Sequence, residues 1–206
     1  MKQLTELATP FVSVANKQIL VDANLPWLKS LRQQAIEQFN ANGLPAKKVE
    51  DWKYTSLWAL AQQTFNHDVA DVTLNEKECD DIALLADAHR IVIIDGIFSS
   101  QLSNISELQA GLSIAPLSAS LSSLENSLGL QVDLAKAGLN ALNTMLMSEG
   151  VVISVDVNVQ VERPIEIIIA NTGNTTNLAT HLRHKIQLES DAKATVIEHY
   201  IGLTDD

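Results

Sequence analysis

The sequence contains little cysteine and few aromatic residues. Cys79 is the one cysteine among 206 residues, and only 4% of the residues are aromatic. One cysteine cannot form a disulfide within the chain, which fits a protein of a reducing compartment. Acidic residues surround Cys79 in the sequence and predict a raised thiol pKa, which disfavours a nucleophile. We therefore expect a cytoplasmic protein without a disulfide framework or a reactive thiol.

Positive charge and long hydrophobic runs are also scarce. The chain has 14 lysines and arginines against 25 acidic residues, so its formal net charge is −11. Such a charge disfavours nucleic-acid binding as the main task. No apolar run approaches the ~20 residues that cross a bilayer, and the opening MKQLTELATPFVSV lacks the apolar core of a signal peptide. We expect no nucleic-acid partner and no membrane partner.

Catalytic and nucleotide-binding motifs are missing as well. The sequence contains no GxGxxG, GxxxxGK[ST], CxxC, HExxH or GxSxG pattern. These patterns mark phosphate-binding loops, metal sites and nucleophile elbows. The sequence therefore favours a protein that is not an enzyme.

The first part of the chain has mixed helix and strand patterns. Pro26 suits a first helical turn, Gly43 suits a helix end, and Asp95-Gly96 is a hairpin signal. A stripe through Leu28, Leu31, Ala35 and Phe39 leaves Arg32 outside it. The patterns predict helices over 25–42, 76–88, 117–128 and 134–148, and strands within 90–98 and 112–117.

The segment from Gly43 to Ala61 concentrates aromatic side chains. Glu50 or Asp51 can cap a helix, and the apolar residues Trp52, Tyr54, Leu57, Trp58 and Ala61 follow. One interpretation is an anchor that docks this helix onto the domain core. The other is a partner-binding patch surrounded by Lys47, Lys48 and Lys53.

The stretch from Val151 to Gly202 has the strongest β pattern. Apolar residues alternate with polar ones from Ile153 to Glu162, which is typical of a half-buried strand. The run IEIIIA is apolar almost throughout and predicts a strand buried on both faces. Strands are expected to start near residues 151, 165, 179 and 194. This even spacing fits stacked coils of a β-solenoid and equally a meander in a β-sandwich.

Three histidines in this stretch are the remaining candidates for chemistry. His181 and His184 should point to opposite faces of a regular strand, so they should not share a metal. His184 and His199 are about one strand spacing apart and could stack on adjacent strands, so the alternative function is that of a cupin-like metal-binding enzyme that uses these two residues. The alternative for His184 is a hydrogen-bonded core histidine.

Four stretches in order resemble the SufB/SufD family of iron–sulfur cluster assembly proteins. The segment GLPAKKVEDWKYTSL carries a signature formed by Gly43, Pro45, Glu50, Trp52, Lys53, Tyr54 and Thr55. IVIIDGIF, LNALNTMLMSEGVVISV and HLRHKIQLESDAKATVIEHYIG resemble later family stretches. The Trp-Lys-Tyr-Thr segment favours the SufD branch over SufB.

The resemblance implies an α+β chain with an N-terminal helical and mixed domain at 1–149. The first coils of a right-handed parallel β-helix would follow at 150–206. It implies a non-catalytic scaffold of the Suf complex, with a role in iron entry, that pairs with SufB and the SufC ATPase. No cofactor is expected in this chain, because the iron–sulfur cluster would sit transiently on the whole complex.

The sequence departs from the family pattern by stopping at Asp206. Family members are longer, so the SufC-binding domain and the C-terminal histidine and cysteine positions would lie outside this sequence. A solenoid that stops within its stack has an open strand edge. We therefore expect self-association through residues ~178–202.

Overall fold

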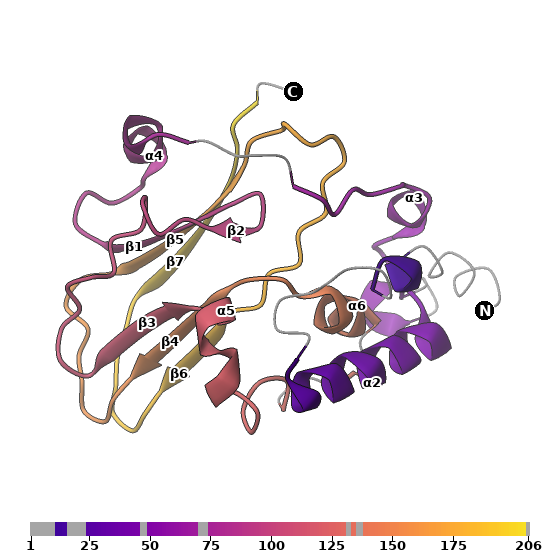
Figure 1. The fold of residues 1–206 in the computed structure, drawn as a ribbon, viewed down its shortest axis with the longest axis horizontal. Coiled ribbons are helices and arrows are strands. Elements are labelled where there is room, and N and C mark those ends of the chain that lie inside the picture. Colours follow the sequence, from indigo (N-terminus) through magenta and orange to yellow (C-terminus); the bar gives the residue numbers. More distant parts are fainter. Residues whose placement is uncertain are drawn as a thin grey trace. The chain divides into compact units, whose positions relative to one another are not determined.

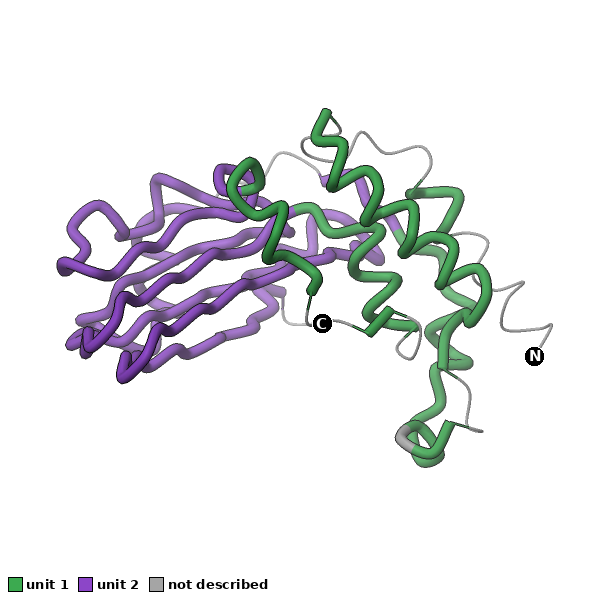
Figure 2. The backbone as a smooth tube through the Cα atoms, turned by 90° about the horizontal axis from the view of Figure 1, so that it is seen from below, with its two compact units in different colours: residues 1–65, 121–148 green, residues 66–120, 149–206 purple. Residues whose placement is uncertain are grey.

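The computed structural model describes residues 11–15, 24–45, 49–69, 74–130, 133–134 and 138–204. The chain forms two compact units, each assembled from two separate stretches (Figure 2). One unit comprises residues 1–65 and 121–148, and the other comprises 66–120 and 149–206. We expected a single boundary near residue 150, but the strands before residue 121 belong with those that follow Ser148.

The first unit is helical. It contains α2 (Pro26–Asn42), η1 (Glu50–Trp52), α3 (Trp58–Ala61), η2 (Leu121–Ser123) and α6 (Gly138–Leu146). The helices α2 and α6 pack against each other, and their core includes Phe39, Leu44 and Met145.

Helix α2 matches its predicted span, and Gly43 ends it with a φ of 63°. Arg32 is nevertheless buried. Its guanidinium donates a hydrogen bond to the carbonyl of Met147 at 2.8 Å, which offsets part of the cost of burying it. Gly138 is the first residue of α6. A Cβ atom added to Gly138 would lie 2.1 Å from the carbonyl oxygen of Gly43. Only glycine permits this approach of the two backbones.

Four helix predictions need correction, one of which is the helix over 76–88, which ends at Ile82 as α4 (Glu76–Ile82). The cap predicted at Glu50 or Asp51 is wrong, because Glu50 opens a short 3-10 turn that has no side-chain cap. The helix predicted over 117–128 is reduced to α5 (Leu117–Ser120) and η2, although its leucine stripe is buried as expected. The helix predicted over 134–148 is described from Gly138 onward, and residues 135–137 lie outside the described residues.

The second unit contains two sheets that share one core (Figure 1). The four-stranded sheet has the order β2-β1-β5-β7, and the three-stranded sheet has the order β3-β4-β6. The strands are β1 (His89–Ile94), β2 (Ile97–Phe98), β3 (Leu112–Pro116), β4 (Val151–Val155), β5 (Ile165–Asn171), β6 (Lys185–Leu188) and β7 (Val196–Gly202). The fold is therefore mixed α+β, as predicted.

Parallel pairing links two successive stretches of the chain in this unit. β4 pairs with β6, and β5 pairs with β7, each in parallel. Outside the strands, parallel bridges join Glu149 to Leu182 and Gln160 to Lys193. The stretch 149–171 thus lies beside the stretch 182–202 at four places, with the same direction of chain in each.

The strand β5 is buried on both faces from Ile165 to Ala170, which confirms the prediction for this apolar run. One face contributes Ile165, Ile167 and Ile169 to the core between the sheets. The other face contributes Ile168 and Ala170 to a second cluster, which includes Cys79 of α4 (Glu76–Ile82).

Two long strands predicted from alternation are wrong in extent. β4 ends at Val155, Val157 is 55% exposed, and Asn158 has a φ of 61° that interrupts an extended strand. The strand predicted to start near residue 179 forms only at Lys185–Leu188. The Asp95-Gly96 hairpin is confirmed, because both residues have positive φ, as a type I′ turn requires.

Candidate functional site

The two residues of the predicted metal pair, His184 and His199, are next to or within strands of different sheets. His184 immediately precedes β6, and His199 is in β7, where it lies opposite Ile168 of β5. His184 Nδ1 accepts a hydrogen bond from the backbone N–H of Val151 at 3.1 Å. Its Nε2 is buried without a hydrogen-bond partner among the described residues. Burial lowers the pKa of His184, and the nearby Glu198 carboxylate opposes this shift.

His181 packs against His67, a residue that the sequence pattern did not indicate. The two rings are stacked with centroids 5.5 Å apart and planes 12° apart. Burial, followed by the charge of His67, lowers the pKa of His181 to about 4. Because the nitrogen lone pairs lie in the ring planes, the stacked rings hold them in two nearly parallel planes that do not converge on one metal ion.

Backbone bonds hold the two segments that carry this stack. The N–H of Asn66 donates to the carbonyl of Asn177 at 3.0 Å, and the N–H of Ala179 donates to the carbonyl of Asn66 at 2.9 Å. His67 therefore meets His181 through long-range pairing of residues 66 and 178. No local sequence signal could have revealed this contact.

Metal coordination finds little support in the part of the chain that the structure describes. There, no group of three or more histidine, cysteine, aspartate or glutamate side chains is placed to hold a metal ion. The assignment of a metal to His184 and His199 stays a prediction. Loss of bound metal on His184→Ala would support it.

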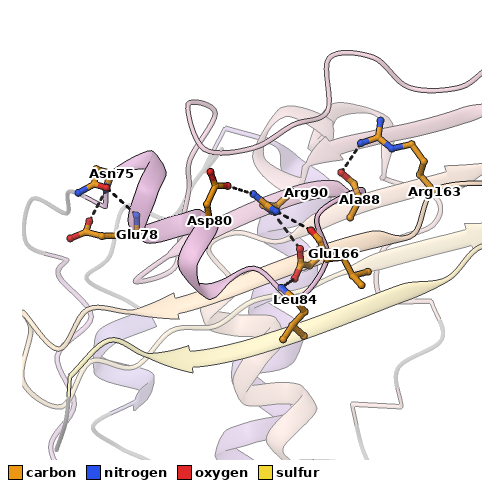
Figure 3. A network of polar contacts seen from close by, with 9 residues as sticks. Asn75, Glu78, Asp80, Leu84, Ala88, Arg90, Arg163 and Glu166 are labelled. Carbon is orange, nitrogen blue, oxygen red and sulfur yellow. Dashed lines mark hydrogen bonds and ion pairs between the residues drawn. The ribbon is translucent and has the colours of Figure 1, made fainter.

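A polar network surrounds Glu166 and Arg90 (Figure 3). Glu166 is fully buried within β5, and its Oε1 accepts the N–H of Leu84 at 2.6 Å. Arg90, on the adjacent strand β1, donates to Glu166 Oε2 at 3.4 Å and to Asp80 Oδ1 at 2.7 Å. Arg90 also donates to the carbonyl of Leu85 at 3.1 Å.

This network stabilises the charged form of Arg90. Burial acts to lower its pKa, but the hydrogen bond to Asp80 and the charges around it raise the pKa above its ordinary value. The guanidinium thus stays charged, and its donors are directed at α4, at the loop that follows it and at β5. The arrangement can hold α4 and the loop after it in place against the four-stranded sheet.

Cys79 lies in the same region, in the buried face of α4, with 2% of its surface exposed. Burial raises the pKa of its thiol; Arg90 lowers it, and the acidic neighbours Asp80 and Glu166 raise it. The predicted direction is confirmed, but the main cause is desolvation rather than neighbouring charge. A buried, protonated thiol is a poor nucleophile.

Two further buried carboxylates bond to the backbone. Asp95 accepts the N–H of Thr172 at 2.9 Å and also the hydroxyl of that residue. Glu149 accepts the N–H groups of Ser118 and Gly150, each at 3.0 Å. These bonds satisfy oxygens that burial would otherwise leave unpaired. Glu166, Asp95 and Glu149 each lie within or next to an apolar strand segment. This placement is the sequence signal that could have revealed the three buried acids.

The aromatic signature segment is largely exposed. Tyr54 is 91% exposed and Trp58 is 52% exposed, whereas Trp52 is half-buried. Lys53 pairs with Glu50, and its ammonium lies 5.1 Å from the centre of the Tyr54 ring. Large exposed aromatic side chains are typical of interaction surfaces. Leu57 and Ala61 of the same segment pack against the core of the first unit, as the anchor interpretation requires, whereas Tyr54 and Trp58 are exposed, as a partner-binding patch requires.

The other signature residues shape the backbone. The N–H of Gly43 donates to the carbonyl of Phe39 at 2.7 Å, and the N–H of Thr55 donates to the carbonyl of Trp52 at 3.0 Å. Pro45 follows the end of α2 and is half-buried. Lys47 and Lys48, named as flanking charges, lie outside the described residues.

A groove of about 770 Å³ in the first unit is lined by α2 and by residues within 125–130 and 133–134. Its polar side chains include Glu37, Glu125 and Asp133, and its apolar ones include Trp27 and Leu31. None of the predicted site residues lines it.

Comparison with known proteins places this architecture in a family. The sequence profile described as "SufBD protein N-terminal region" matches residues 5–167. The chain belongs to the SufBD family. The predicted resemblance is thereby confirmed, and the matched region includes the aromatic signature and the network of Glu166.

Two curated SufBD relatives match most of the chain. It is 30% identical over 176 residues to "Iron-sulfur cluster assembly protein SufD" of Escherichia coli (strain K12). It is 28% identical over 179 residues to an "Iron-sulfur cluster assembly SufBD family protein" of Synechocystis sp.. Each alignment covers 84% of this chain and 39% of the relative. The chain thus spans well under half the length of these SufBD proteins.

No helix among the described residues of this SufBD chain is long and apolar enough to span a membrane.

Proposed function

We propose that this chain acts in iron–sulfur cluster assembly as a non-catalytic scaffold segment of the SufD type. The observation that carries the proposal is the family match over residues 5–167, together with two relatives whose names state this process. The site geometry supports a scaffold rather than an enzyme, since the buried acids of the second unit bond to backbone groups or to Arg90. The cluster, with its iron and sulfide, is cargo of the complex rather than a resident of this chain.

The proposal extends to form. The second unit supplies the first coils of a right-handed parallel β-helix. Two observations support this: stretch 149–171 pairs in parallel with stretch 182–202, and the chain alternates between the two sheets. The right-handed sense follows the strong general preference for right-handed crossovers between parallel strands.

The proposed partners are SufB and the SufC ATPase, in the cytoplasm. A lone buried cysteine, expected to stay reduced, is consistent with that compartment. The exposed Tyr54 and Trp58 offer a surface for one such contact, because aromatic residues contribute strongly to protein interfaces.

Co-purification tests this proposal. The longest natural chain that contains these residues should capture SufB and SufC from the same organism when the three are co-expressed. A Tyr54→Ala/Trp58→Ala variant should capture less SufB with unchanged thermal stability if this surface takes part. Failure of the unsubstituted chain to capture either protein contradicts the assignment of partners.

A further inference from the structure

The groove beside α2 is a feature of the first unit that the proposed function does not use. One of its walls is a stripe of α2 that begins at Trp27 and ends at Gln38. At a rise of ~1.5 Å per residue, this stripe is roughly 16 Å long. The described residues that line the groove all belong to the first unit. The groove is thus built within one unit and is long enough for about three turns of a partner helix.

The groove has apolar side chains on both walls. Leu128 is buried and Leu31 of α2 is half-buried, and both line the groove. The walls meet near Gly129, because a Cβ atom added there would lie 3.2 Å from the side chain of Leu31. Leu130 also lines the groove, yet it is 73% exposed. A large exposed apolar side chain next to buried ones is typical of a surface that a partner covers.

The charged side chains of the groove all have the same sign. Glu37 lies on α2, and Glu125 and Asp133 lie on the other wall. Among the described lining residues there is no lysine, arginine or histidine. A concave surface lined by one sign of charge concentrates ligands of the opposite sign. The groove therefore matches a ligand that combines an apolar face with positive charges on both sides of it.

We propose that this groove binds a basic amphipathic helix of another protein. The apolar face of that helix contacts Leu31, Leu128 and Leu130, and its lysines or arginines lie next to Glu37 and Glu125. An amphipathic helix that places its apolar face in a groove is a recurrent mode of recognition. A small polyamine would match the acidic residues but would leave Leu130 exposed. Complementary charge supplies specificity, so a helix with acidic residues in the same pattern is rejected.

Fluorescence anisotropy with two designed peptides tests the ligand class. Both peptides repeat leucine at helical spacing, and one has lysine at its polar positions where the other has glutamate. The longest natural chain that contains these residues should bind the lysine peptide at least about tenfold more tightly than the glutamate peptide. The affinity for the lysine peptide should fall as salt is added. Purified protein is used, so the result does not depend on whether the chain captures SufB or SufC.

Charge reversal tests the place of binding. Glu37→Lys/Glu125→Lys should raise the Kd of the lysine peptide by about tenfold and lower that of the glutamate peptide. The matched control is Glu107→Lys/Glu162→Lys, which changes the net charge by the same amount at exposed positions of the second unit. It should alter both Kd values much less. Circular dichroism of each variant distinguishes a folding defect from a lost contact.

An apolar substitution tests the other half of the match. Leu130→Gln should weaken binding of the lysine peptide, and a lysine peptide with the same composition in scrambled order should bind poorly to the parent chain. Equal binding of the ordered and scrambled peptides would show that charge alone attracts them, which overturns the proposal.

Two further outcomes would also overturn it. The control variant could weaken binding as much as the groove variant does. The 206-residue chain could bind the lysine peptide while the longest natural chain does not, which would show that another part of the protein covers the groove.

Discussion

Glu166 exemplifies how single buried charges are held in this protein. Its side chain has no exposed surface, yet both oxygens have donors, one from the backbone of Leu84 and one from Arg90. His181 is a different case, because its buried Nε2 has no hydrogen-bond partner among the described residues. A paired charge stabilises the fold as long as its partner remains. An unpaired imidazole is tolerated only while it is neutral.

We expect Arg90→Met to lower the free energy of unfolding by ~3–5 kcal/mol, because it leaves the Glu166 carboxylate buried without a charged partner. Adding Glu166→Gln should recover most of that loss, since an amide is neutral and its oxygen can still accept the N–H of Leu84. Urea denaturation of the single and double variants measures both effects. Equal stability of the two would contradict this account.

The stability of the protein should fall as pH falls from ~6.5 toward 4, with His181 as one cause. Its folded pKa is lowered to about 4, below the ~6.5 of an unfolded chain, so the unfolded state takes up the proton first. The contribution of His181 is complete above pH ~6.5, and about 3 kcal/mol of it is lost by pH ~4.

His181→Phe keeps an aromatic ring against His67 and removes this titration. Urea denaturation between pH 7 and 5 should therefore show a smaller loss of stability for the variant than for the parent chain. An identical pH dependence for the two proteins would exclude His181 as a cause.

At the scale of elements, α4 shows how a short helix is made stable. Asn75 caps it by accepting the N–H of Glu78 at 3.0 Å, and the Glu78 carboxylate accepts the N–H of Asn75 at 2.9 Å. The sequence contains the signal for this reciprocal capping box, since Asn75 precedes Glu78 by three residues. The helix ends at Ile82 rather than at residue 88, because the following loop turns to direct the N–H of Leu84 at Glu166.

Replacing Asn75 with alanine should destabilise α4 by ~1 kcal/mol, the usual cost of losing a cap. Hydrogen exchange at the Glu78 amide, combined with urea denaturation, measures this local loss. Lys77→Ala is the matched control, because its pair with Asp81 is exposed and contributes at most a few tenths of a kcal/mol. Similar exchange in both variants would contradict the role of the cap.

At the scale of the whole molecule, the order of elements along the chain differs from their grouping in space. The strands β1 to β3 precede α6 in the sequence, but they belong to the second unit together with β4 to β7, which follow α6. β1 pairs in parallel with β5, which lies more than 70 residues further along the chain. Such pairing cannot be read from local patterns, since any of several apolar strands could occupy that position.

The sequence by itself determined the helix α2, the Asp95-Gly96 hairpin, the doubly buried strand β5 and the family. Each depends on local periodicity, turn chemistry or a contiguous motif. Only the tertiary structure decided that Arg32 is buried, that His67 stacks on His181 and that Glu166 bonds to Arg90. These contacts join residues far apart in sequence, and their energies depend on burial, which a linear pattern does not contain. For the same reason, the alternation after Val151 indicated strands correctly but not where each strand ends.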